Sequence, residues 1–168
     1  MPTYEITPAV FPDDKQAITA LFTAYTAALG IDLTFQNYQT ELSSLPGKYS
    51  PEQGGCLLVA RDDANKLVGC VAYRALPSSN SDDHSGEGYC EMKRLYLAPS
   101  ARGTGLGTKL IEAIIEHARA SGQYKGMRLD TLPYMESARA LYKRYGFREV
   151  ERYYETPLEG TIFMGLEF

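Results

Sequence analysis

The chain has 168 residues, 44% of them hydrophobic, and a formal net charge of −4 at pH 7. That length fits one domain over residues 1–168, and the negative charge argues against a nucleic-acid-binding protein. No stretch approaches the ~20 apolar residues that cross a bilayer. Residues 1–5 lack the basic start and apolar run of a secretion signal, and three cysteines without zinc-ligand spacing suit a reducing compartment. We therefore expect a cytoplasmic protein without membrane association.

The first third of the chain predicts one strand and two helices. Residues 6–11 favour an opening strand, and Asp13 with Asp14 is typical of a helix N-terminus. Apolar side chains then recur at helical spacing until Gly30, namely Ile18, Leu21, Phe22, Tyr25 and Leu29. A second helix is predicted from a cap at Thr34 to a stop at residues 46–47, Pro-Gly.

The middle of the chain predicts a hairpin and a polar loop. Residues 56–61 and 67–73 have strand composition and are joined by the polar turn 62–66. Residues 77–88 contain few apolar side chains and are expected to form a loop. Its acidic cluster consists of Asp82, Asp83, His84 and Glu87. Acids on such a loop rarely close around an ion, so no metal site is expected.

A strand and a helix flank a glycine-rich segment in the second half. Residues 91–97 have strand character and end before Pro99, which cannot donate to a ladder. The following helix is marked by apolar residues at helical spacing, namely Leu106, Leu110, Ile111, Ile114, Ile115 and Ala118. Gly122 is its expected end. Residues 127–132 then predict a strand, and residues 138–145 a short helix that ends before Gly-Phe.

The glycine-rich segment runs from Arg102 to Thr108, with the sequence Arg-Gly-Thr-Gly-Leu-Gly-Thr. Glycine lets backbone amides approach an anion, and the helix that follows points unpaired N–H groups at the same spot. The segment therefore predicts a phosphate-binding loop. A Walker A loop needs lysine directly after its last glycine, where Thr108 stands. A dinucleotide fingerprint needs its third glycine one position later, so both nucleotide alternatives fail.

What remains, Arg-x-x-Gly-x-Gly, resembles the pyrophosphate loop of the GCN5-related N-acetyltransferase (GNAT) family, whose members use acetyl-coenzyme A. Residues 138–147, Ala-Arg-Ala-Leu-Tyr-x-x-x-Gly-Phe, resemble the second signature of that family. The resemblance extends over nearly the whole chain. It implies an α/β, single-domain acyl-CoA N-acyltransferase fold with a mixed, mostly antiparallel central sheet. Helices would cover both faces, and a splay would separate the fourth and fifth strands.

The resemblance also implies where acetyl-CoA binds. The pyrophosphate would rest on loop amides of Arg102, Gly103, Thr104, Gly105, Leu106 and Gly107, with Thr108 in the first helical turn. The main chain of Leu95, Tyr96 and Leu97 would hold the pantetheine arm. Many members carry asparagine seven residues before the helix tyrosine, whereas this chain has Met135 there. That substitution leaves the contacts of this turn undetermined.

The catalytic residues implied by the resemblance are Glu91 and Tyr142. Glu91 aligns with the family's strand glutamate that acts as general base, and its neighbours Cys90 and Met92 suggest partial desolvation, which would raise its pKa. Tyr142 aligns with the tyrosine near the cofactor sulfur, where a phenol can protonate the leaving thiolate. The alternatives are a solvated Glu91 paired with Lys93 or Arg94, and a core tyrosine without a catalytic role.

The expected activity is transfer of the acetyl group to a primary amine of a small molecule or peptide, by direct attack in a ternary complex. A non-catalytic acyl-CoA sensor is the alternative. Phe35, Tyr38, Tyr153 and Tyr154 are candidate walls of the acceptor pocket, where aromatic rings suit a cation or an apolar body. The acidic loop gives a weak preference for a cationic acceptor. A homodimer stays open as the oligomeric state.

Overall fold

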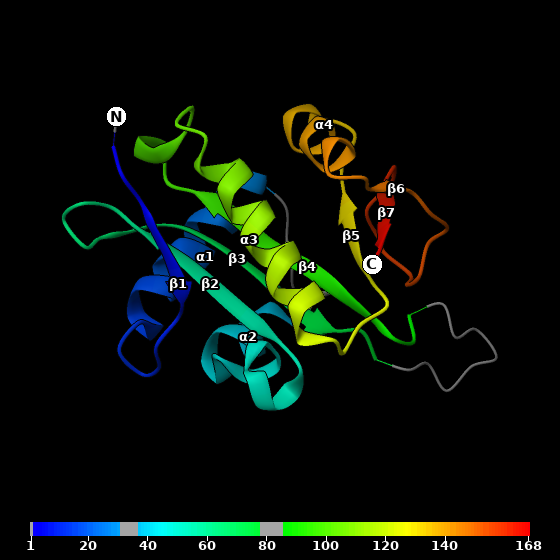
Figure 1. Ribbon diagram of the computed structural model, residues 1–168. Coiled ribbons are helices and arrows are strands. Elements are labelled where there is room, and N and C mark those ends of the chain that lie inside the picture. Colours follow the sequence, from blue (N-terminus) through cyan, green and yellow to red (C-terminus); the bar gives the residue numbers. More distant parts are fainter. Residues whose placement is uncertain (1, 31–36, 78–85) are drawn as a thin grey trace.

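The computed structural model describes residues 2–30, 37–77 and 86–168. Within them, seven strands form one sheet in the order β1-β2-β3-β4-β5-β7-β6 (Figure 1). These strands are β1 (Glu5–Pro8), β2 (Cys56–Arg61), β3 (Leu67–Ala75), β4 (Tyr89–Leu97), β5 (Gly126–Thr131), β6 (Arg148–Glu149) and β7 (Ile162–Glu167). Neighbouring strands run antiparallel except for β4 and β5, which are parallel. The expected mixed, mostly antiparallel sheet is confirmed.

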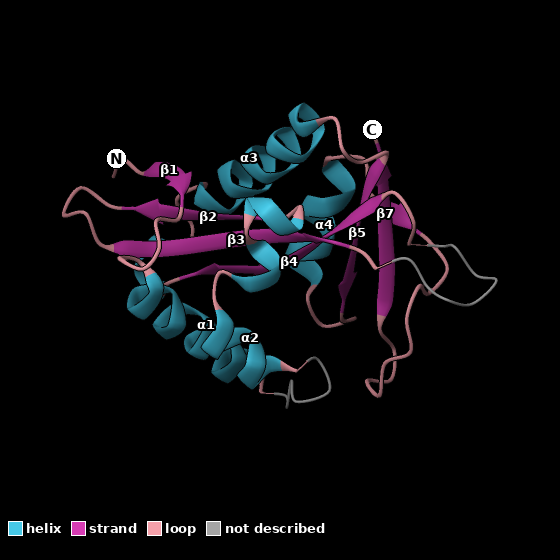
Figure 2. Cartoon of the chain, turned by 90° about the horizontal axis from the view of Figure 1, so that it is seen from below, coloured by secondary structure: helices cyan, strands magenta, loops and turns pink. Residues whose placement is uncertain are grey.

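Helices cover both faces of this sheet (Figure 2). Their bounds are α1 (Lys15–Leu29), α2 (Tyr38–Ser44), α3 (Leu106–Ser121) and α4 (Glu136–Arg144). The apolar side chains of α1 and α2 pack in one buried cluster with Leu57 and Val59 of β2, whereas those of α3 and α4 pack with Leu58 on the opposite face. This division follows from the alternation of side chains along a strand.

Local signals set most of the element ends. Gly30 and Gly122 follow α1 and α3 in the left-handed conformation, with φ of 66° and 67°, as expected of helix-ending glycines. The opening strand is shorter than predicted and ends at Pro8, because the amide of Val10 donates to the Asp14 carboxylate instead of to a strand. The predicted cap at Thr34 and the acids at 82–84 lie outside the described residues.

The sheet opens between β4 and β5. Their pairing covers only Tyr89–Glu91 on β4 and Gly126–Arg128 on β5, and the strands then part (Figure 1). The register between β3 and β4 shifts near Arg94, whose φ of 61° is rare for a residue with a side chain. The expected splay between the fourth and fifth strands is therefore confirmed, and a bulge in β4 lies beside it.

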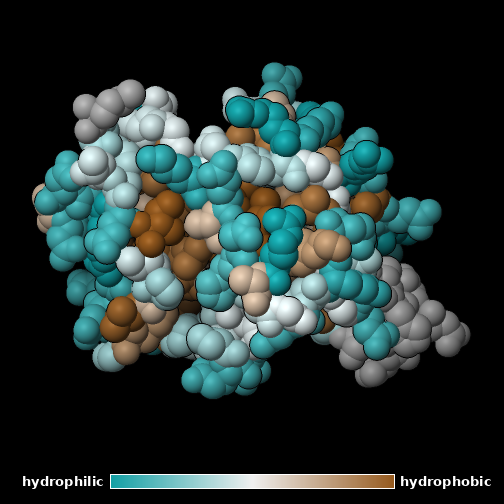
Figure 3. Space-filling model, viewed as in Figure 1, coloured by the Kyte–Doolittle hydropathy of each residue, from teal (hydrophilic) through white to brown (hydrophobic). Residues whose placement is uncertain are grey.

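The surface on the α3 side is mostly hydrophilic, with hydrophobic side chains visible as patches between polar ones (Figure 3). None of the helices in the described ranges is long and apolar enough to cross a membrane.

Candidate active site

The glycine-rich loop joins the end of β4 to the start of α3. Gly103 and Gly105 have φ of 73° and 84°, and a Cβ placed on either would meet no atom within 4 Å. The loop thus needs glycine for its backbone conformation and faces open space. Because α3 begins at Leu106, the first amides of this helix lack intrahelical partners. These features fit the diphosphate of coenzyme A, which needs unpaired donors and close backbone approach.

Arg102 is held at the entrance to this loop. Its Nε donates to the carbonyl oxygen of Leu97 at 3.1 Å, and its guanidinium lies 5.7 Å from the centre of the Tyr96 ring. The remaining guanidinium donors therefore stay close to the loop, where a charged donor adds to the backbone amides.

A cavity of about 600 Å³ extends from this loop between α1, β4 and α4. Its lining includes the predicted cofactor residues Leu95, Tyr96, Leu97, Arg102 and Gly107. It also includes Met135, so the methionine that replaces the family's asparagine does face the cavity. The other predicted loop residues, Gly103, Thr104, Gly105, Leu106 and Thr108, form the turn and the helix start outside that lining, with the Leu106 side chain buried in the core.

The splay contains a second, smaller cavity of about 140 Å³. It shares four lining residues with the first cavity, namely Tyr25, Leu95, Met135 and Ala138. Its remaining wall brings together Lys93 and Arg94 of β4, Asp130 of β5 and Tyr142 of α4. The two cavities are therefore neighbours, with these four side chains between the glycine-loop side and the gap between the strands.

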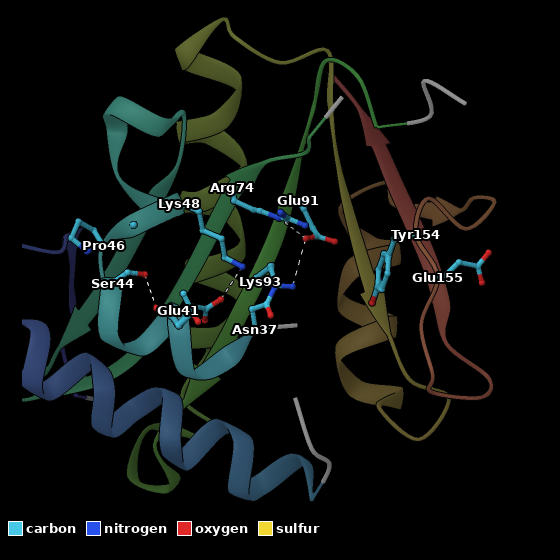
Figure 4. A pocket seen from close by; sticks show the side chains of 12 residues that line it. Asn37, Glu41, Ser44, Pro46, Lys48, Arg74, Glu91, Lys93, Tyr154 and Glu155 are labelled. Atoms are coloured by element: carbon cyan, nitrogen blue, oxygen red, sulfur yellow. Dashed lines mark hydrogen bonds and ion pairs between the residues drawn. The ribbon is translucent and has the colours of Figure 1, made fainter. Parts of the chain in front are cut away.

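A third cavity, of about 400 Å³, lies on the far side of the splay (Figure 4). Most of its lining residues are polar or charged, and Lys93 lines both it and the splay cavity. Its walls come from α2, β3, β4 and the segment before β7, and its charged residues are Glu41, Lys48, Arg74, Glu91, Lys93 and Glu155. The three cavities thus adjoin one another in series, with the glycine loop beside the first and charged walls around the third.

Glu91 lies at the edge of the charged pocket and is 1% exposed. One carboxylate oxygen accepts from Arg74 Nε at 3.0 Å and lies 3.6 Å from Lys93 Nζ, and the other accepts from the Tyr153 hydroxyl at 2.6 Å. Burial on its own would raise the pKa of Glu91, but the two cations and the tyrosine outweigh it and hold the pKa below its usual value. The raised pKa expected from the sequence is wrong. Of the alternative, the pairing with Lys93 is present, but the carboxylate is buried and not solvated.

Asp130 lies on β5, across the splay from β4. No sequence pattern indicated a functional role for it. Its Oδ2 accepts a hydrogen bond from the Tyr154 hydroxyl. Burial, and then the nearby Glu91, raise the pKa of Asp130 above its usual value, although Lys93 and Tyr154 act in the opposite direction. The site thus holds two carboxylates whose environments shift their pKa values apart, which is the usual signature of divided proton roles.

Tyr142 is buried, at 8% exposure, and its side chain reaches the splay cavity from α4. Its ring packs against Phe147 with centroids 5.9 Å apart. Burial raises the pKa of Tyr142 above its usual value, so the phenol keeps its proton at neutral pH. Tyr142 therefore lines the splay cavity as a neutral phenol, which can donate a proton.

A buried ion pair supports β4 beneath the charged pocket. Both oxygens of Glu41 on α2 accept from the Arg94 guanidinium, at 2.8 and 3.1 Å, and Lys48 Nζ adds a contact at 2.9 Å. Arg94 also lies over the rings of Tyr25 and Tyr38, 5.7 and 5.4 Å from their centres. The sequence did not indicate this pair, which fixes the side chain at the bulge.

The four predicted acceptor residues have different positions. Tyr154 lines the charged pocket, and Tyr153 lies next to it with ring centroids 5.5 Å apart, bonded to Glu91. Tyr38 is buried against Arg94 and is not part of the lining of that pocket. Phe35 lies outside the described residues.

A sheet that splays beside a glycine-rich helix start, with a cavity in the gap, is the architecture expected of an acyl-CoA N-acyltransferase fold. Residues 18–147 match the Acetyltransferase (GNAT) family, and the chain belongs to that family. It is 40% identical over 156 residues to an uncharacterized N-acetyltransferase of Schizosaccharomyces pombe, a match that covers 93% of this chain and 90% of that protein.

Solved structures agree with this fold. A GNAT-family acetyltransferase from Staphylococcus aureus Mu50 superposes with a TM-score of 0.76 at 19% identity, covering 98% of this chain and 99% of that one. The Salmonella typhimurium protein YncA, solved with its cofactor acetyl-CoA, superposes with a TM-score of 0.71 at 20% identity, covering 98% and 93%. Family and fold together are those of an acetyl-CoA-dependent N-acetyltransferase.

Proposed function

We propose that the protein transfers the acetyl group of acetyl-CoA to a primary amine of a small molecule or peptide, by direct attack while both substrates are bound. The observation that carries this proposal is a row of three adjoining cavities whose two ends differ. Its cofactor end combines the glycine loop with a largely apolar cavity, and its other end is a pocket with charged walls. Two substrates that enter from opposite sides can meet in the splay without a covalent enzyme intermediate.

The residues that would hold acetyl-CoA follow from the chemistry of its parts. Loop amides from Gly103 to Thr108 and the Arg102 guanidinium suit the diphosphate, and the β4 segment 95–97 suits the amide-bearing arm. When bound, acetyl-CoA supplies a thioester whose acyl carbon an amine can attack. A backbone amide near the β4 bulge is suited to bind the thioester oxygen, because irregular pairing leaves amides outside the ladder.

Tyr142 is proposed as the acid that protonates the departing sulfur. Burial raises the pKa of this phenol, so Tyr142 holds its proton in the resting protein and gives it to sulfur only as the proton of the newly bonded nitrogen moves onto its oxygen. Tyr142 would therefore finish each turnover in the form in which it began.

The acceptor must lose a proton before it can attack, because an alkyl ammonium has a pKa of ~10.4. Two carboxylates are candidates to accept this proton: Glu91, which lines the charged pocket, and Asp130, which lines the splay cavity. The family resemblance implies Glu91. The pocket pairs cations with anions, such as Lys48 with Glu41 and Arg74 with Glu91. This mixture favours a polar acceptor that carries further hydrogen-bonding groups beside its amine.

The test is thiol release from acetyl-CoA with a panel of amines, including a polyamine, amino acids, their amides and a peptide with a free N-terminus. We expect at least one amine to release thiol in proportion to acetylated product identified by mass spectrometry. Calorimetry with coenzyme A serves as a control for a folded donor site. Binding of coenzyme A without transfer to any amine would contradict the proposed activity and would favour a sensor.

A further inference from the structure

Asp130 occupies the boundary between the two substrate cavities. It lines the splay cavity together with Tyr142, and its hydrogen-bond partner Tyr154 lines the charged pocket. Lys93, which lines both cavities, stands beside it in the splay. The Asp130 carboxylate is therefore next to the point at which an amine from the charged pocket would meet an acyl group from the loop side.

The two carboxylates differ in how fully they are engaged. Glu91 is 1% exposed, and both of its oxygens are bound, by Arg74 on one side and Tyr153 on the other. Asp130 is only partly buried, and within the described residues no group donates to its Oδ1. A proton acceptor needs an oxygen that the substrate can reach, and Asp130 offers one.

We propose that Asp130 is the catalytic base that removes the proton of the acceptor ammonium, while Glu91 positions Arg74 and Lys93. This proposal rests on the proposed acetyl transfer and assigns the step that the transfer needs first. Glu91 then serves as a fixed anion between two cations, and Asp130 takes the role that the family resemblance would give to Glu91.

The charges around Asp130 are consistent with such a base. The titratable and charged groups that face it from the packed elements are Glu91, Lys93 and Arg94 of β4, Tyr153 and Tyr154 before β7, Tyr142 of α4 and Tyr25 of α1. Burial and Glu91 raise the pKa of Asp130, which increases its basicity relative to an ordinary aspartate. Burial also raises the pKa of Tyr25 to about 12, so this phenol is neutral at pH 7 and does not compete.

The proton balance closes with two residues. Asp130 takes one proton from the ammonium, which frees the nitrogen lone pair to form the C–N bond. As the C–S bond breaks and its electrons pass to sulfur, Tyr142 gives its phenolic proton to that sulfur. As it does so, Tyr142 takes the second proton from the nitrogen, and Asp130 releases the first to solvent. The net products are an acetamide, a free thiol and one proton.

The first experiment compares Asp130→Asn with Glu91→Gln, using the best amine of the panel. We expect Asp130→Asn to lower kcat by about 10²-fold or more at pH 7 and to regain activity as the pH rises toward the amine's own pKa. Glu91→Gln should act mainly on the KM for the amine and lower kcat by less than tenfold. Asp13→Asn, an exposed aspartate far along the chain, is the matched control for loss of one carboxylate. Coenzyme A affinity and circular dichroism verify that each variant is folded.

The second experiment needs no turnover. The pKa of Asp130 is measured by carbon NMR titration of its carboxyl, assigned through Asp130→Asn. We expect the pKa of Asp130 to lie above 3.8 in the wild type. It should be higher still in Tyr154→Phe, because this variant lacks the hydrogen bond that stabilises the ionised carboxylate. Tyr153→Phe, which lacks the Glu91 bond instead, should leave the pKa of Asp130 nearly unchanged.

Two results would overturn the assignment while leaving acetyl transfer intact. One is an active protein in which Asp130→Asn keeps more than half of the wild-type kcat. The other is a loss of kcat in Glu91→Gln that exceeds the loss in Asp130→Asn. A wild-type protein that acetylates no amine would instead defeat the proposed function itself, so the two failures are distinguishable.

Discussion

Replacement of Glu41 by glutamine should destabilise the protein by about 3 kcal/mol at pH 7. The side chain is 3% exposed and binds Arg94, which is equally buried, through both carboxylate oxygens. Glutamine keeps the volume but leaves the guanidinium without an anion and turns an NH₂ group toward its donors. Breaking a buried pair in this way costs about 3–5 kcal/mol, because a charge remains buried and uncompensated.

The pH dependence of stability gives a second estimate of what the Glu41 ion pair contributes to the free energy of unfolding. Burial opposes ionisation of Glu41, but Arg94 and Lys48 outweigh it and lower the pKa from 4.5 to about 2. At about 1.4 kcal/mol per pH unit, the lowered pKa contributes about 3 kcal/mol above pH 4.5. Because the folded-state pKa is depressed, the contribution is complete above pH 4.5 and is lost as the pH falls toward 2. Roughly half or less of this contribution should remain at pH 3.

The assay is urea unfolding followed by circular dichroism, at pH 7 and in steps down to pH 3. The gap in unfolding free energy between wild type and Glu41→Gln should be about 3 kcal/mol at pH 7 and should shrink below pH 4.5. Glu116→Gln, which removes an exposed pair with Arg119 at 3.7 Å, is the control and should change stability by less than about 0.5 kcal/mol. A gap below about 1 kcal/mol at pH 7, or one that does not change with pH, would refute the reasoning.

Two further predictions concern the donor site. Gly105→Ala should weaken coenzyme A binding about tenfold by calorimetry, because a left-handed alanine costs about 1–2 kcal/mol and displaces the loop. Gly122→Ala has the same strain at the other end of α3, and an equal loss of affinity there would contradict a role in binding. Tyr142→Phe should lower kcat about 10²-fold in a thiol-release assay while coenzyme A affinity stays within about twofold. Tyr145→Phe, at the end of α4, loses a bond to Glu112 of α3 and should retain near-normal kcat, and equal activity of the two variants would count against Tyr142 as the acid.

The glycine loop and the helix after it were predictable because their signals are local. A run of glycines followed by a helical repeat determines the loop conformation and the start of α3 within about ten residues. The bounds of β2 and the end of α3 were likewise predicted from neighbouring residues. The splay between β4 and β5 was predicted from the family resemblance alone, because no local sequence pattern indicates where two parallel strands separate.

The environment of Glu91 was not predictable from its neighbours. Cys90 and Met92 flank it in sequence, but adjacent residues of a strand point to opposite faces and do not surround each other's side chains. The residue that does face Glu91 is Arg74, its register partner on β3. Glu41 and Arg94 are separated by 53 positions, and Tyr153 and Glu91 by 62, so only the folded chain shows these contacts. The role proposed for Asp130 could not be predicted, because a single aspartate within a strand sequence is compatible with exposure, an ion pair or a catalytic position alike.

The consecutive residues Tyr153 and Tyr154 donate hydrogen bonds to the two strands that border the splay. Tyr153 donates to Glu91 of β4, and Tyr154 donates to Asp130 of β5. The irregular segment from Val150 to Thr161 therefore ties the two strands together at the gap through two adjacent phenols. A change in the spacing of these phenols would disturb Glu91 and Asp130 together.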